Sequence, residues 1–86
     1  MPTISEFFGI LIKMYFDDHF PAYFHVEYQG KKAQISIEDG KLVKGKLSPR
    51  ALRLVEEWRQ MHVQELKKNW ERAKNLQLPK KIKPLD

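Results

Sequence analysis

The sequence predicts an α+β domain: an antiparallel meander sheet of three or four strands, with one face covered by a long or bent C-terminal helix. Three features predict this fold. Two hairpin turns punctuate residues 22–47, apolar and polar residues alternate between those turns, and apolar residues follow a helical spacing after Ser48. At 86 residues we expect one domain, 1–86, divided into a sheet at 9–47, a helix at 49–77 and an extended basic tail at 79–86.

The sheet prediction rests on residues 22–47, which are typical of two β-hairpins sharing their middle strand. Gln29-Gly30 and Asp39-Gly40 stand where two-residue hairpin turns belong. With the first turn at Gln29-Gly30, apolar residues pair with apolar residues, and Glu27 meets Lys32. A slip by one residue would destroy both matches. The second turn places Glu38 opposite Lys41 and Ile37 opposite Leu42.

This register predicts two different sheet faces. The apolar face, which we expect the helix to cover, carries Phe24, Val26, Ala33, Ile35, Ile37 and Leu42. The opposite face, the better functional surface, carries Tyr23, His25, Glu27, Lys32, Gln34 and Ser36.

Before the hairpins, residues 9–16 predict one more strand, since Ile10, Ile12 and Met14 alternate with Leu11 and Lys13. Residues 1–8 are expected to be a lead-in. Residues 17–21 contain an acidic pair and end in proline, so they predict a loop.

Ser48 and Pro49 predict the start of the helix, as its N-cap and its first helical residue. A helix of about 27 residues would be about 40 Å long, more than the sheet is wide. We therefore expect a bend near Met61 and His62, or a projecting distal half whose exposed Trp70 would meet a partner. The predicted apolar stripe is Ala51, Leu54, Val55, Trp58, Met61, His62, Leu66, Trp70, Ala73 and Leu76.

Composition narrows the class of protein. The chain has no cysteine, which excludes disulfides and thiolate metal sites, and no cofactor is expected. The N-terminal region lacks a leader or membrane-spanning pattern, so we expect a cytoplasmic protein with no membrane partner. The net charge of +5 suits either an acidic protein or nucleic acid. Lysines 31, 32, 41, 44 and 46 either protect a sheet edge or follow a phosphate backbone.

Several polar groups are candidates for chemistry, although the pattern favours a protein that is not an enzyme. His25, Glu27, Lys13 and Tyr15 would supply an acid, a base and a cation for acid–base work on a phosphoester. Asp18, His19 and His25 are the candidate metal ligands, at a spacing that matches no established metal motif.

On the helix, His62, Glu65 and Asn69 share one side. We expect them to form a buried or half-buried hydrogen-bonded network that fixes how the helix sits on the sheet.

Nearly the whole chain resembles a small bacterial family of unknown function, the one numbered four thousand one hundred and sixty. Its members are commonly encoded beside another small protein, which implies a toxin–antitoxin-like pair. The family usually reads Pro-Pro-His-Phe-His where this chain has Pro21-Ala22-Tyr23-Phe24-His25, so its first histidine is absent here. The resemblance is carried by Met1-Pro2-Thr3-Ile4-Ser5, Gly9-Ile10, Met14-Tyr15, Asp18-His19, Pro21, Phe24-His25-Val26-Glu27-Tyr28, Ser48-Pro49-Arg50-Ala51-Leu52, Glu57-Trp58, His62, Glu65-Leu66, Asn69-Trp70 and Pro79-Lys80-Lys81-Ile82.

These observations favour a protein–protein interaction module that pairs with a small protein encoded nearby. The distal helix would also serve for self-association. The alternative is an RNA- or DNA-binding, or RNA-acting, protein that uses the face bearing His25 and Glu27. The residues predicted to bind are Tyr23, His25, Glu27, Trp70, Lys80 and Lys81.

Overall fold

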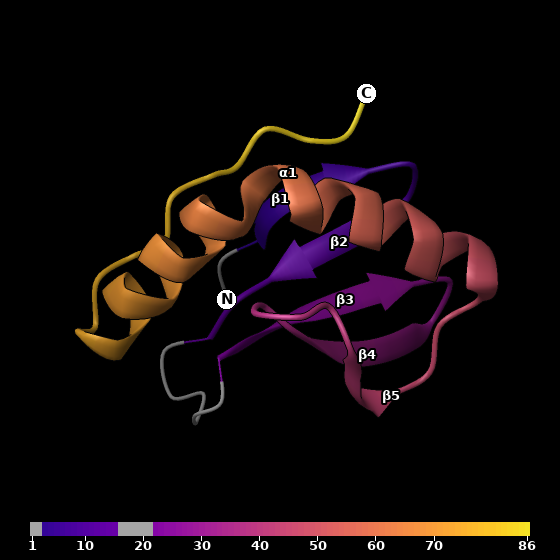
Figure 1. The fold of residues 1–86 in the computed structure, drawn as a ribbon, viewed down its shortest axis with the longest axis horizontal. Coiled ribbons are helices and arrows are strands. Elements are labelled where there is room, and N and C mark those ends of the chain that lie inside the picture. Colours follow the sequence, from indigo (N-terminus) through magenta and orange to yellow (C-terminus); the bar gives the residue numbers. More distant parts are fainter. Residues whose placement is uncertain (1–2, 16–21) are drawn as a thin grey trace.

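In the computed structural model, which describes residues 3–15 and 22–86, one helix lies against one face of an antiparallel meander (Figure 1). The α+β prediction is confirmed, but the sheet has five strands rather than three or four. In sheet order they are β1 (Thr3–Phe7), β2 (Ile10–Lys13), β3 (Tyr23–Tyr28), β4 (Lys31–Ser36) and β5 (Leu42–Gly45), followed by α1 (Pro49–Lys74). No helix in these two ranges is long and apolar enough to cross a bilayer.

The additional strand is β1, which we had expected to be a lead-in. Its hairpin with β2 turns at Phe8 and Gly9, whose φ angles are 51° and 79°. Phenylalanine rarely adopts a positive φ, so Phe-Gly is a poor hairpin signal in a sequence. The predicted strand at 9–16 is correspondingly shorter, and the predicted loop at 17–21 lies outside the described residues.

The predicted register of the first hairpin is confirmed at every position, from Tyr23 opposite Ser36 to Tyr28 opposite Lys31. The register of the second hairpin is wrong, because Leu42 pairs with Ile35 and not with Ile37. Instead of pairing with β5, Ile37 donates its N–H to the carbonyl of Ala22 (3.1 Å). Gly40 donates to the carbonyl of Ser36 (3.0 Å), so the turn is wider than Asp39-Gly40 alone implied.

The apolar face of the sheet packs against α1. Phe24 and Val26 of β3 are fully buried beneath the helix, and Trp58 of α1 is buried with them. The Trp58 ring lies 5.5 Å from the Phe7 ring and 5.9 Å from the Phe24 ring, measured between centroids. The division into a covered and an outer sheet face therefore follows the predicted alternation.

The helix begins as predicted, since the Ser48 hydroxyl accepts from the N–H of Ala51 (3.2 Å) and Pro49 is the first helical residue. The bend is confirmed at His62, whose φ and ψ are −131° and 23°. Met61 and Leu76, assigned to the buried stripe, are instead exposed. The helix ends at Lys74, short of residue 77, because Leu76 adopts a φ of 59° and Gln77 N–H bonds to the Arg72 carbonyl.

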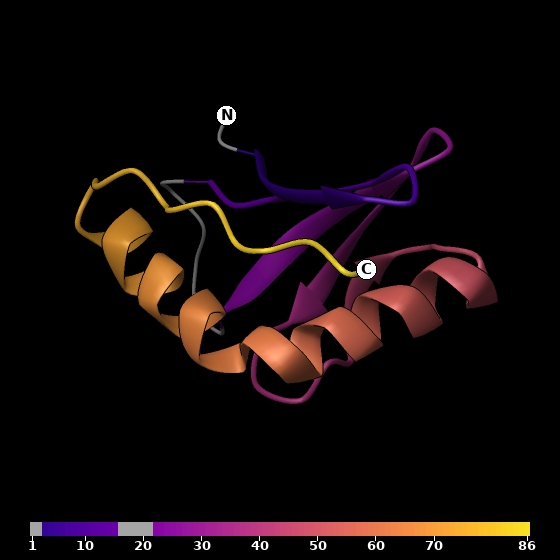
Figure 2. The same ribbon diagram turned by 90° about the horizontal axis from the view of Figure 1, so that it is seen from above.

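After α1 the chain turns back along the helix towards β1 (Figures 1 and 2). Ile82 is 4% exposed, and its N–H donates to the carbonyl of Ile4 in β1 (2.7 Å). The Trp58 indole N–H donates to the carbonyl of Lys83 (2.9 Å). The basic tail is therefore part of the folded domain and lies against the outer edge of β1.

Candidate functional site

The structure gathers the predicted acid–base cluster on the outer sheet face. Lys13 is the cross-strand neighbour of His25, and its ammonium donates to the Glu27 carboxylate at 3.0 Å. The Tyr15 ring meets the His25 ring edge-on, with centroids 4.2 Å apart. These four candidates are therefore true neighbours, as strands β2 and β3 require. Because Glu27 is engaged by Lys13, the pair also has a structural role between these two strands.

Tyr23 and His25, both predicted to bind, are in ring contact at 5.3 Å. The candidate metal site is not placed, because Asp18 and His19 lie outside the described residues. Within residues 3–15 and 22–86, no three histidine or carboxylate groups come together as a metal site would require.

Trp70 requires a correction. We expected an exposed indole if the distal helix projected, but the bend returns it to the core, where it is 6% exposed and lies 5.7 Å from the Tyr23 ring. It is therefore not available as an exposed contact. The side chains of Lys80 and Lys81 are exposed. The Asn69 Nδ2 group donates to the Lys80 carbonyl, and the Lys80 N–H donates to Asn69 Oδ1, each at 2.8 Å.

The predicted helix network is thus divided into two parts. His62 bonds to Glu65 through Nδ1 (2.6 Å), whereas Asn69 fastens the tail and accepts from Arg72. Asn69 is fully buried, and because both of its bonds to another segment go to the Lys80 backbone, it fixes the tail to the helix rather than the helix to the sheet.

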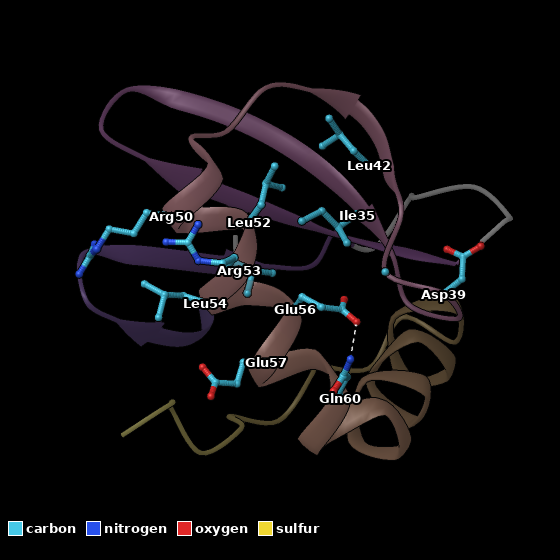
Figure 3. A pocket seen from close by; sticks show the side chains of 12 residues that line it. Ile35, Asp39, Leu42, Arg50, Leu52, Arg53, Leu54, Glu56, Glu57 and Gln60 are labelled. Carbon is cyan, nitrogen blue, oxygen red and sulfur yellow. Dashed lines mark hydrogen bonds between the residues drawn. The ribbon is translucent and has the colours of Figure 1, made fainter.

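A large hollow lies elsewhere, between β5 and the first half of α1, and we call it the β5 groove. Its volume is about 790 Å³, and its apolar lining comes from Ile35, Leu42, Leu52, Leu54 and Val55. Leu42 of β5 and Leu52 of α1 line the groove from two different elements, and Ile35 lies beside Leu52 and below Leu42 in the view of Figure 3. Arg53 lies towards one end of the groove, and Asp39 and Glu56 lie towards the other (Figure 3).

One end of the β5 groove is closed by a network of charged groups. The Arg59 guanidinium bonds to both oxygens of Glu56, at 2.8 and 2.7 Å, and to the Ile37 carbonyl at 2.9 Å. The Arg59 hydrogen bonds lower the pKa of Glu56, while Glu56 raises the pKa of Arg59. Gly40 packs closely against this pair. A Cβ at this position would lie 2.1 Å from a Glu56 oxygen, so a larger residue does not fit.

Asp39, on the same turn, accepts the Lys41 N–H at 3.0 Å, and this bond lowers the pKa of its carboxyl group. At the closed end, therefore, Glu56 is paired with Arg59, and Asp39 is an exposed carboxylate bonded to the backbone of its own turn.

The other end of the groove differs in charge. Arg53 is exposed, and within the described parts of the chain it has neither an ion pair nor a side-chain hydrogen bond. Arg50, on the same turn of α1, only donates to the Tyr28 hydroxyl (3.3 Å). A guanidinium without a carboxylate partner beside an apolar hollow is suited to binding an acidic group.

Alongside the groove, β5 presents an open strand edge. It is the last strand in the sheet order, and each of its residues is exposed. Leu42 and Val43 are 44% and 50% exposed, which is high for aliphatic side chains in a strand. An exposed edge carrying apolar residues is a template for pairing with another chain.

The family model for a domain of unknown function (DUF4160) matches residues 9–71 of the 86. The chain belongs to this family. The match runs from β2 through most of α1 and includes both the β5 groove and the outer-face cluster. No curated protein and no solved structure is significantly similar to the chain.

Sequence reasoning missed the β5 groove for a specific reason. Pairing with Ile37, as predicted, or with Ile35, as observed, places Leu42 on the covered face in either case. The prediction that the helix covers Leu42 is wrong, because this side chain stays 44% exposed beside the groove, which apolar alternation does not indicate. The available signal was the apolar pair Leu42-Val43 among lysines 41, 44 and 46 in a short segment ending at Gly45. Such a pattern is typical of a protected edge strand.

Proposed function

We propose that this DUF4160 protein is a protein–protein interaction module that receives a small partner protein along β5, as one half of a toxin–antitoxin-like pair. The observation that carries the proposal is the open edge of β5, where Leu42 and Val43 are exposed in a strand with a neighbour on one side only among the described residues. Addition of a strand to such an edge is a recurrent mode of recognition, because main-chain hydrogen bonds supply affinity.

Charge supports an acidic partner. Lys41, Lys44 and Lys46 are exposed on and beside β5, and the whole chain carries +5. A second copy of this chain would bring like charges together across the new strand pair, which is destabilising. An acidic partner would be attracted to the same edge and would associate faster at low salt.

The test is co-expression with the small protein encoded beside its gene, followed by co-purification and calorimetry. The informative variant is Val43→Glu, which places a carboxylate on the edge. Met61→Glu is the matched control, since Met61 is another exposed aliphatic side chain (64%), on α1 away from the β5 groove. We expect a complex with the wild type and with Met61→Glu, and a much weaker complex with Val43→Glu. Absence of a complex with the wild type, or indifference to Val43→Glu, overturns the proposal.

The second candidate function is RNA or DNA binding by the outer sheet face. It is favoured by the contacts of the Tyr15 and Tyr23 rings with His25 beside Lys13. Aromatic groups next to cations suit single-stranded nucleic acid. This function predicts copurifying nucleic acid whose binding weakens steeply with salt. It also predicts that His25→Ala abolishes any cleavage of RNA.

A further inference from the structure

We infer that the β5 groove selects the partner's sequence: it accepts an extended segment with apolar side chains at alternate positions and acidic side chains between them. This inference rests on the proposed function, because the segment is the strand that pairs with β5. It adds the chemistry by which that strand would be recognised.

The register of the sheet leads to this pattern. Leu42 pairs with Ile35, and Ile35 pairs with Phe24, so all three lie on the covered face. Lys44 pairs with Gln34, and Gln34 pairs with His25, so Lys44 lies on the outer face. Leu42 and Lys44 lie on opposite faces although they are two residues apart, because the ladder between β4 and β5 shifts between Gln34 and Ile35. A regular strand added beyond β5 has its own side chains alternating between the two faces, so one set lies on the side of Leu42 and the other on the side of Lys44.

On the covered face, the added side chains would lie beside Leu42 and above the β5 groove. The opposite wall there is formed by Leu52 of α1, and the floor by the buried side chains of Ile35 and Val55. A hollow of about 790 Å³ has room for aliphatic side chains that would otherwise remain in water. The groove therefore favours apolar residues at these positions.

On the outer face, the alternate side chains would lie beside Lys44, where a carboxylate is favoured and a cation is disfavoured. Arg53 supplies a further unpaired cation at the rim of the groove. At the other end, Glu56 is paired with Arg59, whereas Asp39 and Glu57 remain exposed carboxylates in the lining. The attraction for an acidic segment therefore comes from Lys44 on the outer face and from Arg53 and Arg50 at their end of the groove.

The experiment uses three fluorescein-labelled octapeptides and the full chain. The first alternates valine and glutamate, the second alternates valine and lysine, and the third has the composition of the first with its apolar residues grouped together. Binding is followed by fluorescence anisotropy at two salt concentrations, and methyl NMR maps the contact. We expect only the first peptide to bind, with shifts at Ile35, Leu42 and Leu52.

Two variants then separate the groove from the edge. Leu42→Thr removes aliphatic surface while retaining a residue that favours strands, and Arg53→Glu reverses the charge on the rim. We expect each to weaken binding about tenfold. Lys68→Glu, a charge reversal on an exposed part of α1 outside the groove, is the control that should bind like the wild type. Chemical denaturation verifies that each variant is folded.

The outcomes distinguish this inference from the proposed function. Suppose that the neighbouring gene product binds and that Val43→Glu abolishes this binding, while Leu42→Thr and Arg53→Glu leave it unchanged. The proposed interaction function is then supported, and the inference that the groove selects the partner's sequence is overturned. Equal binding of all three peptides, or shifts confined to the outer face, also overturns the inference. Binding of a second copy of this chain at the groove, seen as a concentration-dependent dimer, overturns the inference that the groove binds an acidic segment of a partner protein.

Discussion

Both edge strands of the sheet, β1 and β5, have backbone N–H and C=O groups without a neighbouring strand on one side, but only one of these edges is covered. At the β1 edge, the tail packs against the strand: Ile82 is buried and bonds to Ile4, and Lys83 bonds to Trp58. At the β5 edge, no strand or tail among the described residues covers Leu42 and Val43. One edge is closed by the chain itself, and the other is left open with lysines beside it.

This difference indicates which edge contributes to folding and which is available for binding. A covered edge adds buried apolar area and hydrogen bonds to the folded state, whereas an open edge retains unpaired backbone groups that water must satisfy. Gly45, with a φ of 88°, lies so close to β4 that a Cβ would stand 2.1 Å from the Lys32 carbonyl oxygen. The short β5 is therefore held firmly on its inner side, while its outer side stays free.

Removal of the β1 cover should have the largest effect on stability. A chain ending at Leu78 loses the burial of Ile82 and the bonds to Trp58 and Asn69. We expect the free energy of unfolding to fall by about 3–5 kcal/mol, measured by urea denaturation. Lys81→Ala, a change at an exposed tail position, is the control and should change stability by less than about 0.5 kcal/mol. A truncated chain as stable as the wild type would show that the tail is not part of the fold.

The turn that closes the β5 groove should be the next most sensitive feature. Gly40→Ala combines a positive φ of 75° with a Cβ that would stand 2.1 Å from Glu56 and 2.5 Å from Arg59. We expect a loss of about 2–4 kcal/mol in unfolding free energy. Gly30→Ala is the matched control, since its φ is 77° and nothing lies within 4 Å of the added Cβ, so only backbone strain of about 1 kcal/mol applies. Equal losses for the two variants would contradict a close contact at Gly40.

The pH dependence of stability should reveal the Glu56–Arg59 pair. Because hydrogen bonds from Arg59 lower the pKa of Glu56 in the folded protein, this carboxylate stabilises the fold above its ordinary value of 4.5. That stabilisation is lost as the pH falls through the lowered pKa. Glu56→Gln should therefore be less stable than the wild type at pH 7, by under about 1 kcal/mol because the carboxylate is partly exposed. The difference should shrink in acid, and a difference that grows instead would exclude the pair as its cause.

The smallest stability effect should be at the open edge. Val43→Glu replaces a half-exposed side chain, so we expect the unfolding free energy to stay within about 0.5 kcal/mol of the wild type. Binding of the small partner should nonetheless be strongly reduced, because a carboxylate at the edge repels an acidic strand. Thermal denaturation and calorimetry on the same samples separate the two effects. A large loss of stability would mean that β5 contributes more to folding than its exposure indicates.

Much of the fold could be predicted from local patterns. Alternation and the Gln29-Gly30 turn determined every pair between β3 and β4, while Ser48 and Pro49 determined where α1 begins. The outer-face cluster of Lys13, Tyr15, His25 and Glu27 also followed from alternation, because β2 lies beside β3. These features depend on neighbours in sequence or on one strand pair.

The rest was decided by contacts between distant residues, which no local pattern encodes. The course of the second hairpin depends on Arg59, 22 positions along the chain, which binds the Ile37 carbonyl and draws the turn towards α1. The burial of Trp70 depends on the bend at His62, and the closed β1 edge depends on a tail whose prolines and lysines are typical of a free terminus. The β5 groove is lined by residues of β4, of β5 with its preceding turn, and of α1. Such a hollow is determined by packing, because apolar spacing alone does not say which surfaces remain uncovered.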